Sequence, residues 1–148
     1  MKKFIFVFAI LLGMVSSSTA QEYQSAVGLR FGYPTSVTYK HYLTETNAFE
    51  VYAGTRYSAV FVNAAYQIHN PLGEVDNLEW YYGFGGGVIF GNGFTGALVS
   101  GYLGLQYTLD DAPVTFSIDW VPSFLFGNNY SGFGGDYAGL SARYILNR

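Results

Sequence analysis

The stretch Ala26-Val27-Gly28-Leu29-Arg30-Phe31 alternates between two kinds of side chain. In an extended strand Val27, Leu29 and Phe31 point to one side and Arg30 to the other, because strand side chains alternate with a period of two. Six further charged residues lie in the same way between apolar residues of the opposite face. They are Lys40, Glu50, Arg56, Glu79, Asp119 and Arg143. The pattern predicts a sheet with one apolar face and one charged face.

Eight segments with this strand-like pattern follow one another, and no segment after residue 20 has sustained helical periodicity. They cover residues 23–32, 36–43, 47–57, 58–69, 78–90, 96–109, 113–126 and 135–146. Turn-forming stretches such as Asn70-Pro71-Leu72-Gly73 separate most of them, whereas the junction at Tyr57-Ser58 has no Gly, Pro or Asn. Pro122 lacks an N–H group, which predicts a bulge or an early end of pairing in the seventh segment. Residues 127–135 are expected to form an outward loop.

The first twenty residues resemble a secretory signal peptide. Lys2 and Lys3 precede an apolar run from residue 4 to residue 14, and Ser18-Thr19-Ala20 is a small-residue cleavage site before Gln21. The run is shorter than the roughly 20 apolar residues of a spanning helix. We therefore expect residues 1–20 to be removed and residues 21–148 to form one exported domain. The chain has no cysteine, so no disulfide is expected.

The two-faced pattern fits a membrane barrel, which shows its apolar face to lipid and keeps its charges inside. The 128 residues that follow residue 20 allow 16 residues for each of eight strands with its connection, which is enough for the roughly 9–11 residues of a tilted membrane strand plus a turn. The prediction is an all-β, eight-stranded antiparallel up-and-down transmembrane β-barrel. An even number of strands would place both chain ends on the periplasmic side.

The seven charged residues are predicted to form a polar network inside this barrel, with Lys40–Glu50 and Asp119–Arg143 as the expected pairs. Arg30, Arg56 and Glu79 complete the set. The interior of an eight-stranded barrel is filled by side chains, so the network is expected to be structural and not a conduction path. Aromatic residues are expected at the two membrane interfaces. They are Phe31, Trp80, Phe90, Trp120, Phe126 and Tyr144.

Other chemistries have little support in the sequence. The glycine-rich stretch at residues 83–87 lacks the Gly-Lys-Ser/Thr ending of a phosphate loop. His41 and His69 lie on different predicted strands, with no metal-ligand spacing and no Ser-His-carboxylate arrangement. Without its first twenty residues the chain has five basic and ten acidic residues, so no basic patch for nucleic acid is expected. No catalytic residue, metal or cofactor is predicted.

Several stretches of the sequence resemble those of small gram-negative outer-membrane β-barrel proteins, the eight-stranded type of outer membrane proteins A and X. The resemblance is closer to a subgroup of short members. The stretches are Gly28-Leu29-Arg30-Phe31-Gly32-Tyr33-Pro34, Trp80-Tyr81-Tyr82-Gly83-Phe84-Gly85, Ile118-Asp119-Trp120-Val121-Pro122 and Leu140-Ser141-Ala142-Arg143-Tyr144. The resemblance covers the chain after residue 20 and concerns the fold, not catalysis. It implies a porin-like cell-envelope protein in the outer membrane, monomeric, in contact with membrane lipid and lipopolysaccharide, and inserted by the barrel-assembly machinery. The family commonly ends in an aromatic residue, whereas this chain ends in Asn147-Arg148.

Three functions remain open at this point. The first is a non-enzymatic barrel with a role in membrane integrity or surface contact, and it is the one we expect. The second is an outer-membrane enzyme that modifies lipid A. The third is a soluble periplasmic barrel that binds an apolar ligand as lipocalins do, with apolar residues inside and charges outside.

Overall fold

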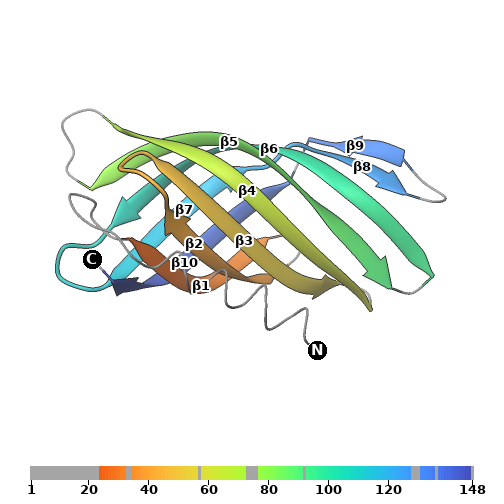
Figure 1. Cartoon of the computed structure of the whole chain (residues 1–148), viewed down its shortest axis with the longest axis horizontal. Helices are drawn as coiled ribbons and strands as arrows, with labels where there is room; N and C mark the ends of the chain where they lie inside the picture. Colours follow the sequence, from red (N-terminus) through yellow and green to blue (C-terminus); the bar gives the residue numbers. More distant parts are fainter. Residues whose placement is uncertain are drawn as a thin grey trace.

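The computed structural model describes residues 24–32, 35–56, 58–72, 77–91, 93–127, 131–135 and 137–147, with Arg56 and Phe94 described by their backbone alone. The expected signal peptide at residues 1–20 lies outside this range. The described part of the chain consists of strands and turns (Figure 1). Within it, no helix has the length and apolar character needed to cross a membrane.

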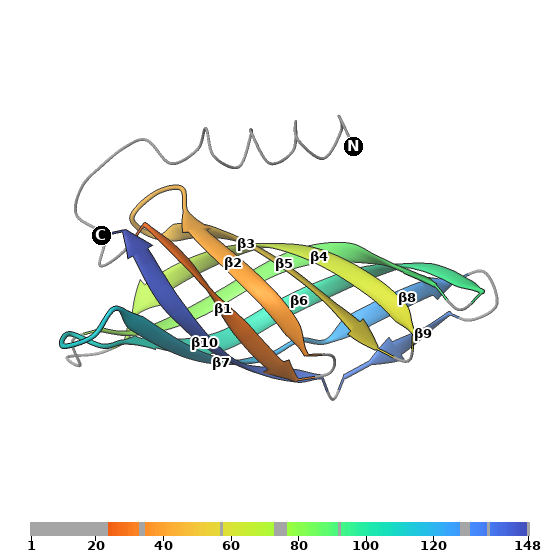
Figure 2. The ribbon, with the colours of Figure 1, turned by 90° about the horizontal axis from the view of Figure 1, so that it is seen from below.

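The strands form one closed antiparallel sheet. In the described ranges they are β1 (Ser25–Gly32), β2 (Ser36–Tyr42), β3 (Asn47–Arg56), β4 (Ala59–Pro71), β5 (Leu78–Gly91), β6 (Phe94–Thr108), β7 (Val114–Trp120), β8 (Ser123–Gly127), β9 (Ser131–Gly134) and β10 (Ala138–Asn147). Neighbours in sequence pair from β1 to β7, and β10 pairs with both β7 and β1, which closes the barrel. β7 and β8 both pair with β6, one after the other, so together they fill one strand position in the barrel. β9 pairs with β8, and β9 and β10 together fill the next position (Figure 2). The ten strands thus fill eight positions, and the predicted eight-stranded antiparallel up-and-down barrel is confirmed.

The interruption of the seventh position lies at Pro122, where the sequence predicts it. β7 ends at Trp120 and β8 begins at Ser123. The register along β6 is unchanged across the gap, because Leu103 pairs with Trp120 and Ser100 pairs with Ser123. The N–H of Gly101 still donates to the Pro122 carbonyl at 2.9 Å. Pairing therefore ends early because proline has no N–H to donate, and no bulge is needed.

The eighth position contains an irregularity that the sequence analysis missed. Residues 127–135 are predicted as a loop, but β9 occupies Ser131–Gly134 and pairs with β8, so that prediction is wrong for these four residues. Trp120 pairs with Ala138, whereas Ser123 pairs with Gly134, so the register shifts by one residue between β9 and β10. The Trp120 indole N–H donates to the Gly135 carbonyl at 2.6 Å beside this shift.

The weakly marked junction at residues 57–58 lies between the paired ends of β3 and β4. Arg56 pairs with Ala59, so only two residues connect β3 to β4. Ser58 has a φ of 67°, in the left-handed region that two-residue hairpins favour. The predicted boundary is confirmed, and the turn forms without the glycine or asparagine that usually marks such a site.

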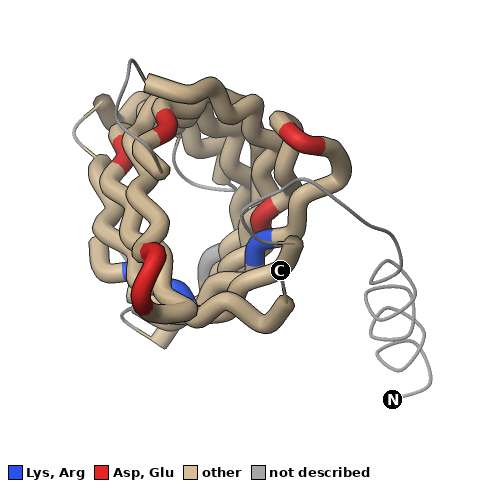
Figure 3. Tube along the Cα trace, turned by 90° about the vertical axis from the view of Figure 1, so that its left-hand side faces the viewer, with Lys and Arg blue, Asp and Glu red and all other residues tan. Residues whose placement is uncertain are grey.

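β1 begins and β10 ends at the same end of the barrel. We call this end the terminal end and the opposite end the far end. Near the terminal end the wall has an apolar outer face and a polar inner face. Ile118 is 55% exposed on the outside, while its neighbours Ser117 and Asp119 are buried inside. Figure 3 shows the trace as a closed ring that carries charged positions around it.

Candidate functional site in the barrel interior

Glu50 on β3 is the centre of a buried ion cluster. Its carboxylate lies 2.5 Å from Arg143 Nη2 and 3.9 Å from Lys40 Nζ. Thr38 and Gln67 donate hydrogen bonds to its two oxygens at 2.7 and 3.0 Å. Glu50 and Lys40 face each other in register on β3 and β2, so the predicted Lys40–Glu50 pair is present. One anion thus lies between two cations, Lys40 on the neighbouring strand β2 and Arg143 on β10.

Asp119 on β7 forms the second cluster. Arg30 donates two hydrogen bonds to its carboxylate, at 2.6 and 2.9 Å, and the Tyr81 hydroxyl donates a third at 2.6 Å. The guanidinium of Arg30 occupies the space that a side chain at Gly139 would fill, and Tyr81 does the same at Gly104. These two glycines therefore make room for the large groups that surround Asp119.

The predicted Asp119–Arg143 pair is wrong for a geometric reason. β7 and β10 are neighbours, but Arg143 lies opposite Thr115. Asp119 is four residues further along β7, which is roughly 14 Å at about 3.4 Å per residue. Arg143 instead reaches across the barrel to Glu50, and Arg30 comes from β1 to Asp119.

Glu79 belongs to a third, less buried group at the terminal end. Its Oε2 accepts a hydrogen bond from the Tyr42 hydroxyl at 3.1 Å and lies 3.1 Å from His69 Nδ1. Gln106 links this group to the Glu50 cluster, because its amide oxygen accepts from Lys40 at 3.0 Å and its amide nitrogen donates to Tyr42 at 2.9 Å. The three clusters contain three cations and three anions, so the described network is electrically balanced.

The remaining predicted residues are placed as follows. The side chain of Arg56 lies outside the described part of the structure. The side chains of Phe31, Phe90, Phe126 and Tyr144 are exposed on the outer face near strand ends, and Trp80 is half-buried and stacks on Tyr82 with ring centroids 5.4 Å apart. Trp120 is also exposed but lies opposite Leu103, where the seventh position is interrupted. Trp120 therefore lies on the outer face away from the ends of β6, and its expected place at a membrane interface stays a prediction.

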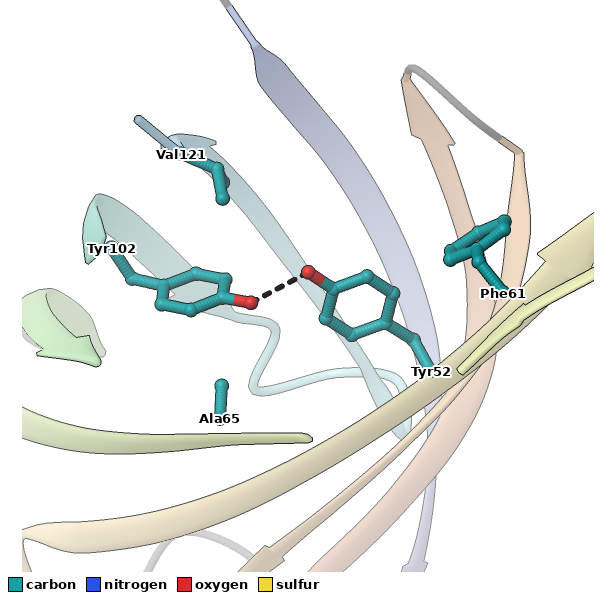
Figure 4. Close-up of a cluster of buried hydrophobic side chains, with 5 residues drawn as sticks. All are labelled: Tyr52, Phe61, Ala65, Tyr102 and Val121. Atoms are coloured by element: carbon teal, nitrogen blue, oxygen red, sulfur yellow. Dashed lines mark hydrogen bonds between the residues drawn. The ribbon is translucent and has the colours of Figure 1, made fainter. Parts of the chain in front are cut away.

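A pair of tyrosines separates the ion clusters from the far half of the interior. Tyr52 and Tyr102 come from opposite walls, and their hydroxyl oxygens are 2.6 Å apart (Figure 4). Phe61 and Val121 pack around them in one buried cluster. On the other side, Arg30 lies over the Tyr52 ring at 5.0 Å from its centroid. Sequence alternation places these tyrosines inside, but it does not show that they meet.

Replacing Tyr102 with phenylalanine is expected to lower the free energy of unfolding by about 1–2 kcal/mol, because the Tyr52 hydroxyl loses its buried partner. Urea unfolding of the protein in lipid vesicles measures the change. Tyr107→Phe is the matched control, since Tyr107 is 41% exposed on the outer face. The double variant Tyr52→Phe/Tyr102→Phe should lose less than Tyr102→Phe alone, because neither hydroxyl then stays unpaired. Equal stability of Tyr102→Phe and the unchanged protein would contradict the role given to this pair.

The two histidines lie inside the terminal end. His41 Nδ1 is 2.8 Å from the Ser25 hydroxyl, and His69 lies between Glu79 and the amide oxygen of Gln67. The Ser–His contact and the His–Glu contact thus involve different histidines. Among the described residues, no group of three or more His, Cys, Asp or Glu side chains is arranged to hold a metal ion.

No family model, curated protein or solved structure matches this chain. The resemblance to small outer-membrane barrels therefore stays a prediction from the sequence.

Proposed function

We propose that this protein is an integral outer-membrane β-barrel with a role in membrane integrity or surface contact, and that it is not an open pore. The observation that carries the proposal is the direction of its side chains. Large apolar residues such as Leu103 and Ile118 are about half exposed on the outer wall, while Lys40, Glu50 and Arg143 are fully buried inside. A continuous exposed apolar wall is unfavourable in water and favourable in lipid. Charged side chains are excluded from that wall in a membrane barrel and lie in its interior.

The packing of the terminal half supports the absence of an open pore. Lys40, Glu50, Gln67, Gln106 and Arg143 are each at most 1% exposed, so water has almost no access to them from either end. These side chains come from five strands and contact one another across the barrel axis. An ion that crossed the barrel would have to break these contacts.

The proposal assigns no enzymatic activity. Ser25 contacts His41, but the carboxylate beside a histidine is that of Glu79, which contacts His69. A hydroxyl nucleophile needs its base and an orienting acid in one chain of contacts. The expected partners are instead the lipids and lipopolysaccharide around the wall and, during insertion, the barrel-assembly machinery.

Cysteine labelling tests the proposal directly, because the chain has no cysteine of its own. Single cysteines at Val62, Leu103 or Ile118, which are 38–55% exposed, should react with a lipid-soluble maleimide and resist a charged one in whole cells. Ser58→Cys, exposed in the turn at the far end, should react with the charged reagent. Ready reaction of Leu103→Cys with the charged reagent would show that the wall faces water and would overturn the proposal.

A further inference from the structure

The barrel wall is taller on one side than on the other. β1 and β2 contain eight and seven residues, whereas β4, β5 and β6 contain 13, 14 and 15. Each of these strands has one end at the terminal end, because β1 begins there and neighbouring strands run antiparallel. The difference therefore lies at the far end, where β1 and β2 stop short of β6 and β8 (Figure 2). We call the outer side of β1 and β2 the short face, and the outer side of β4, β5 and β6 the tall face.

The connection between β1 and β2 is too short to make the short face taller. Gly32 ends β1 and Ser36 begins β2, so three residues join the two strands. Arg30 already pairs with Ser36, and five residues separate this last pair, which is the length of an ordinary hairpin loop. The low rim is therefore set by the chain itself.

The apolar bands of the two faces differ in height. On β5 the outward positions run from Trp80 to Phe90, ten residues, or roughly 34 Å of strand at about 3.4 Å per residue. On β1 they run from Val27 to Phe31, four residues, or roughly 14 Å. With the tilt of about 35–45° that membrane strands have, these lengths give heights of roughly 25 Å and 10 Å. The tall face thus matches the apolar band of about 25 Å of a membrane barrel, and the short face reaches less than half of it.

One phenylalanine on each face lies at a comparable level of the barrel. Phe31 is six residues from Ser25, where β1 begins, and Phe84 is six residues from Leu78, where β5 begins. Both side chains point outward and are exposed, 49% and 68%. Only Gly32 follows Phe31 in β1, whereas seven more residues of β5 follow Phe84. Phe31 therefore lies at the rim of its face, and Phe84 lies near the middle of its own.

A bilayer of even thickness would not fit both faces. If the hydrocarbon matched the tall face, the ends of β1 and β2 at Gly32 and Ser36 would lie near the middle of the hydrocarbon. Backbone that leaves a sheet is strongly unfavourable there, because its polar groups have no water to bind. Local thinning of the bilayer is the milder adjustment to a wall that is too short. Tilting the barrel would not replace it, since tilting does not lengthen the short face.

We propose, on the basis of the membrane location proposed above, that the short face thins the bilayer beside it. The lipid headgroups on the far side then come down to the level of Phe31 and of Val37, which is one residue from the end of β2 and 58% exposed. The tall face keeps a bilayer of ordinary thickness. The protein is thus a site of asymmetric membrane thickness, with bilayer lipid as the partner of the short face.

A pair of lysine substitutions tests the thinning. The chain without residues 1–20 is folded into dioleoylphosphatidylcholine vesicles, and urea unfolding gives the equilibrium constant for unfolding. Phe84→Lys should raise this constant by at least about thirtyfold relative to Phe84→Met, because lysine is most unfavourable near the bilayer midplane. Phe31→Lys should raise it by less than about sixfold relative to Phe31→Met, because lysine near an interface costs little. The methionine variants remove the aromatic ring without adding a charge.

The outcomes separate the thinning from the membrane location. An effect at Phe31 as large as that at Phe84 would overturn the thinning and leave the membrane location standing. Small effects at both positions would overturn the membrane location and the thinning with it, since an outer wall in water tolerates lysine.

A second measurement needs no charged variant and decides the matter if Phe84→Lys does not insert. Leu29 and Leu103 are both 49% exposed, and they lie four and five residues from the terminal ends of β1 and β6. A fluorophore on Leu29→Cys or Leu103→Cys is quenched by a nitroxide on the lipid headgroup or at the end of an acyl chain. The ratio of headgroup to chain-end quenching should be more than about twofold higher at Leu29, because the thinned bilayer brings headgroups nearer.

Equal quenching ratios at the two positions would contradict the thinning. Quenching at Leu103 with none at Leu29 would also contradict it, because a protein and not lipid would then cover the short face. Absence of quenching at both positions would overturn the membrane location.

Discussion

Replacing Glu50 with alanine is expected to lower the free energy of unfolding by about 3–5 kcal/mol. The change leaves Arg143 and Lys40 buried without their shared anion. Thr38 and Gln67 also lose the acceptor of their hydrogen bonds. Urea unfolding in lipid vesicles, followed by the shift between heated and unheated samples on a gel, measures the loss.

Glu45→Ala is the matched control, because Glu45 is exposed in the turn between β2 and β3. It should change the stability by less than about 0.5 kcal/mol. Conductance of Glu50→Ala in planar bilayers should equal that of the unsubstituted protein, since the network holds the barrel together and carries no current. A stable Glu50→Ala barrel with an altered single-channel current would reverse this assignment.

Replacing Asp119 with alanine is expected to have a comparable effect, again about 3–5 kcal/mol, because Arg30 is then buried without an anion. The Tyr81 hydroxyl loses its acceptor in the same substitution. Arg30→Met alone should also be strongly destabilising, since it leaves Asp119 unpaired. The same unfolding measurement applies to both single variants.

The double variant Arg30→Met/Asp119→Leu measures the interaction free energy between Arg30 and Asp119. Removing both charges should restore most of the lost stability, because a buried ion pair replaced by apolar groups is often neutral or better. The interaction term of the double-mutant cycle should therefore be large, on the order of 1–3 kcal/mol. Purely additive losses would mean that Arg30 and Asp119 act separately and not as a pair.

The general architecture could be predicted from the sequence because it depends on local alternation. Each charged residue between apolar neighbours, such as Arg30 in its strand, fixes which side chains face inward. The same alternation places Leu103 and Ile118 outside, and Pro122 marks the interruption between β7 and β8. These features need only the period of a strand and the missing N–H of proline.

The partners inside the barrel could not be predicted in the same way. Glu50 and Arg143 are 93 residues apart, and Arg30 and Asp119 are 89 apart. Their contact depends on the shear of the closed sheet and on the lengths of side chains that reach across it. Neighbouring strands gave a correct pair only for Lys40 and Glu50, which lie in register. β9 was missed because its glycine-rich sequence is equally typical of a loop.

The pairing of the first strand with the last has a consequence for the timing of assembly. Arg30, Lys40 and Glu50 are all synthesised before residue 51, but Asp119 and Arg143 arrive near the end of the chain. Until β10 docks on β1, Arg30 lacks its anion Asp119, and Glu50 has Lys40 beside it but not Arg143. The cluster around Asp119 and the closure of the cylinder are thus completed in one late event, because Arg30 and Arg143 reach their anions only once β10 is in place.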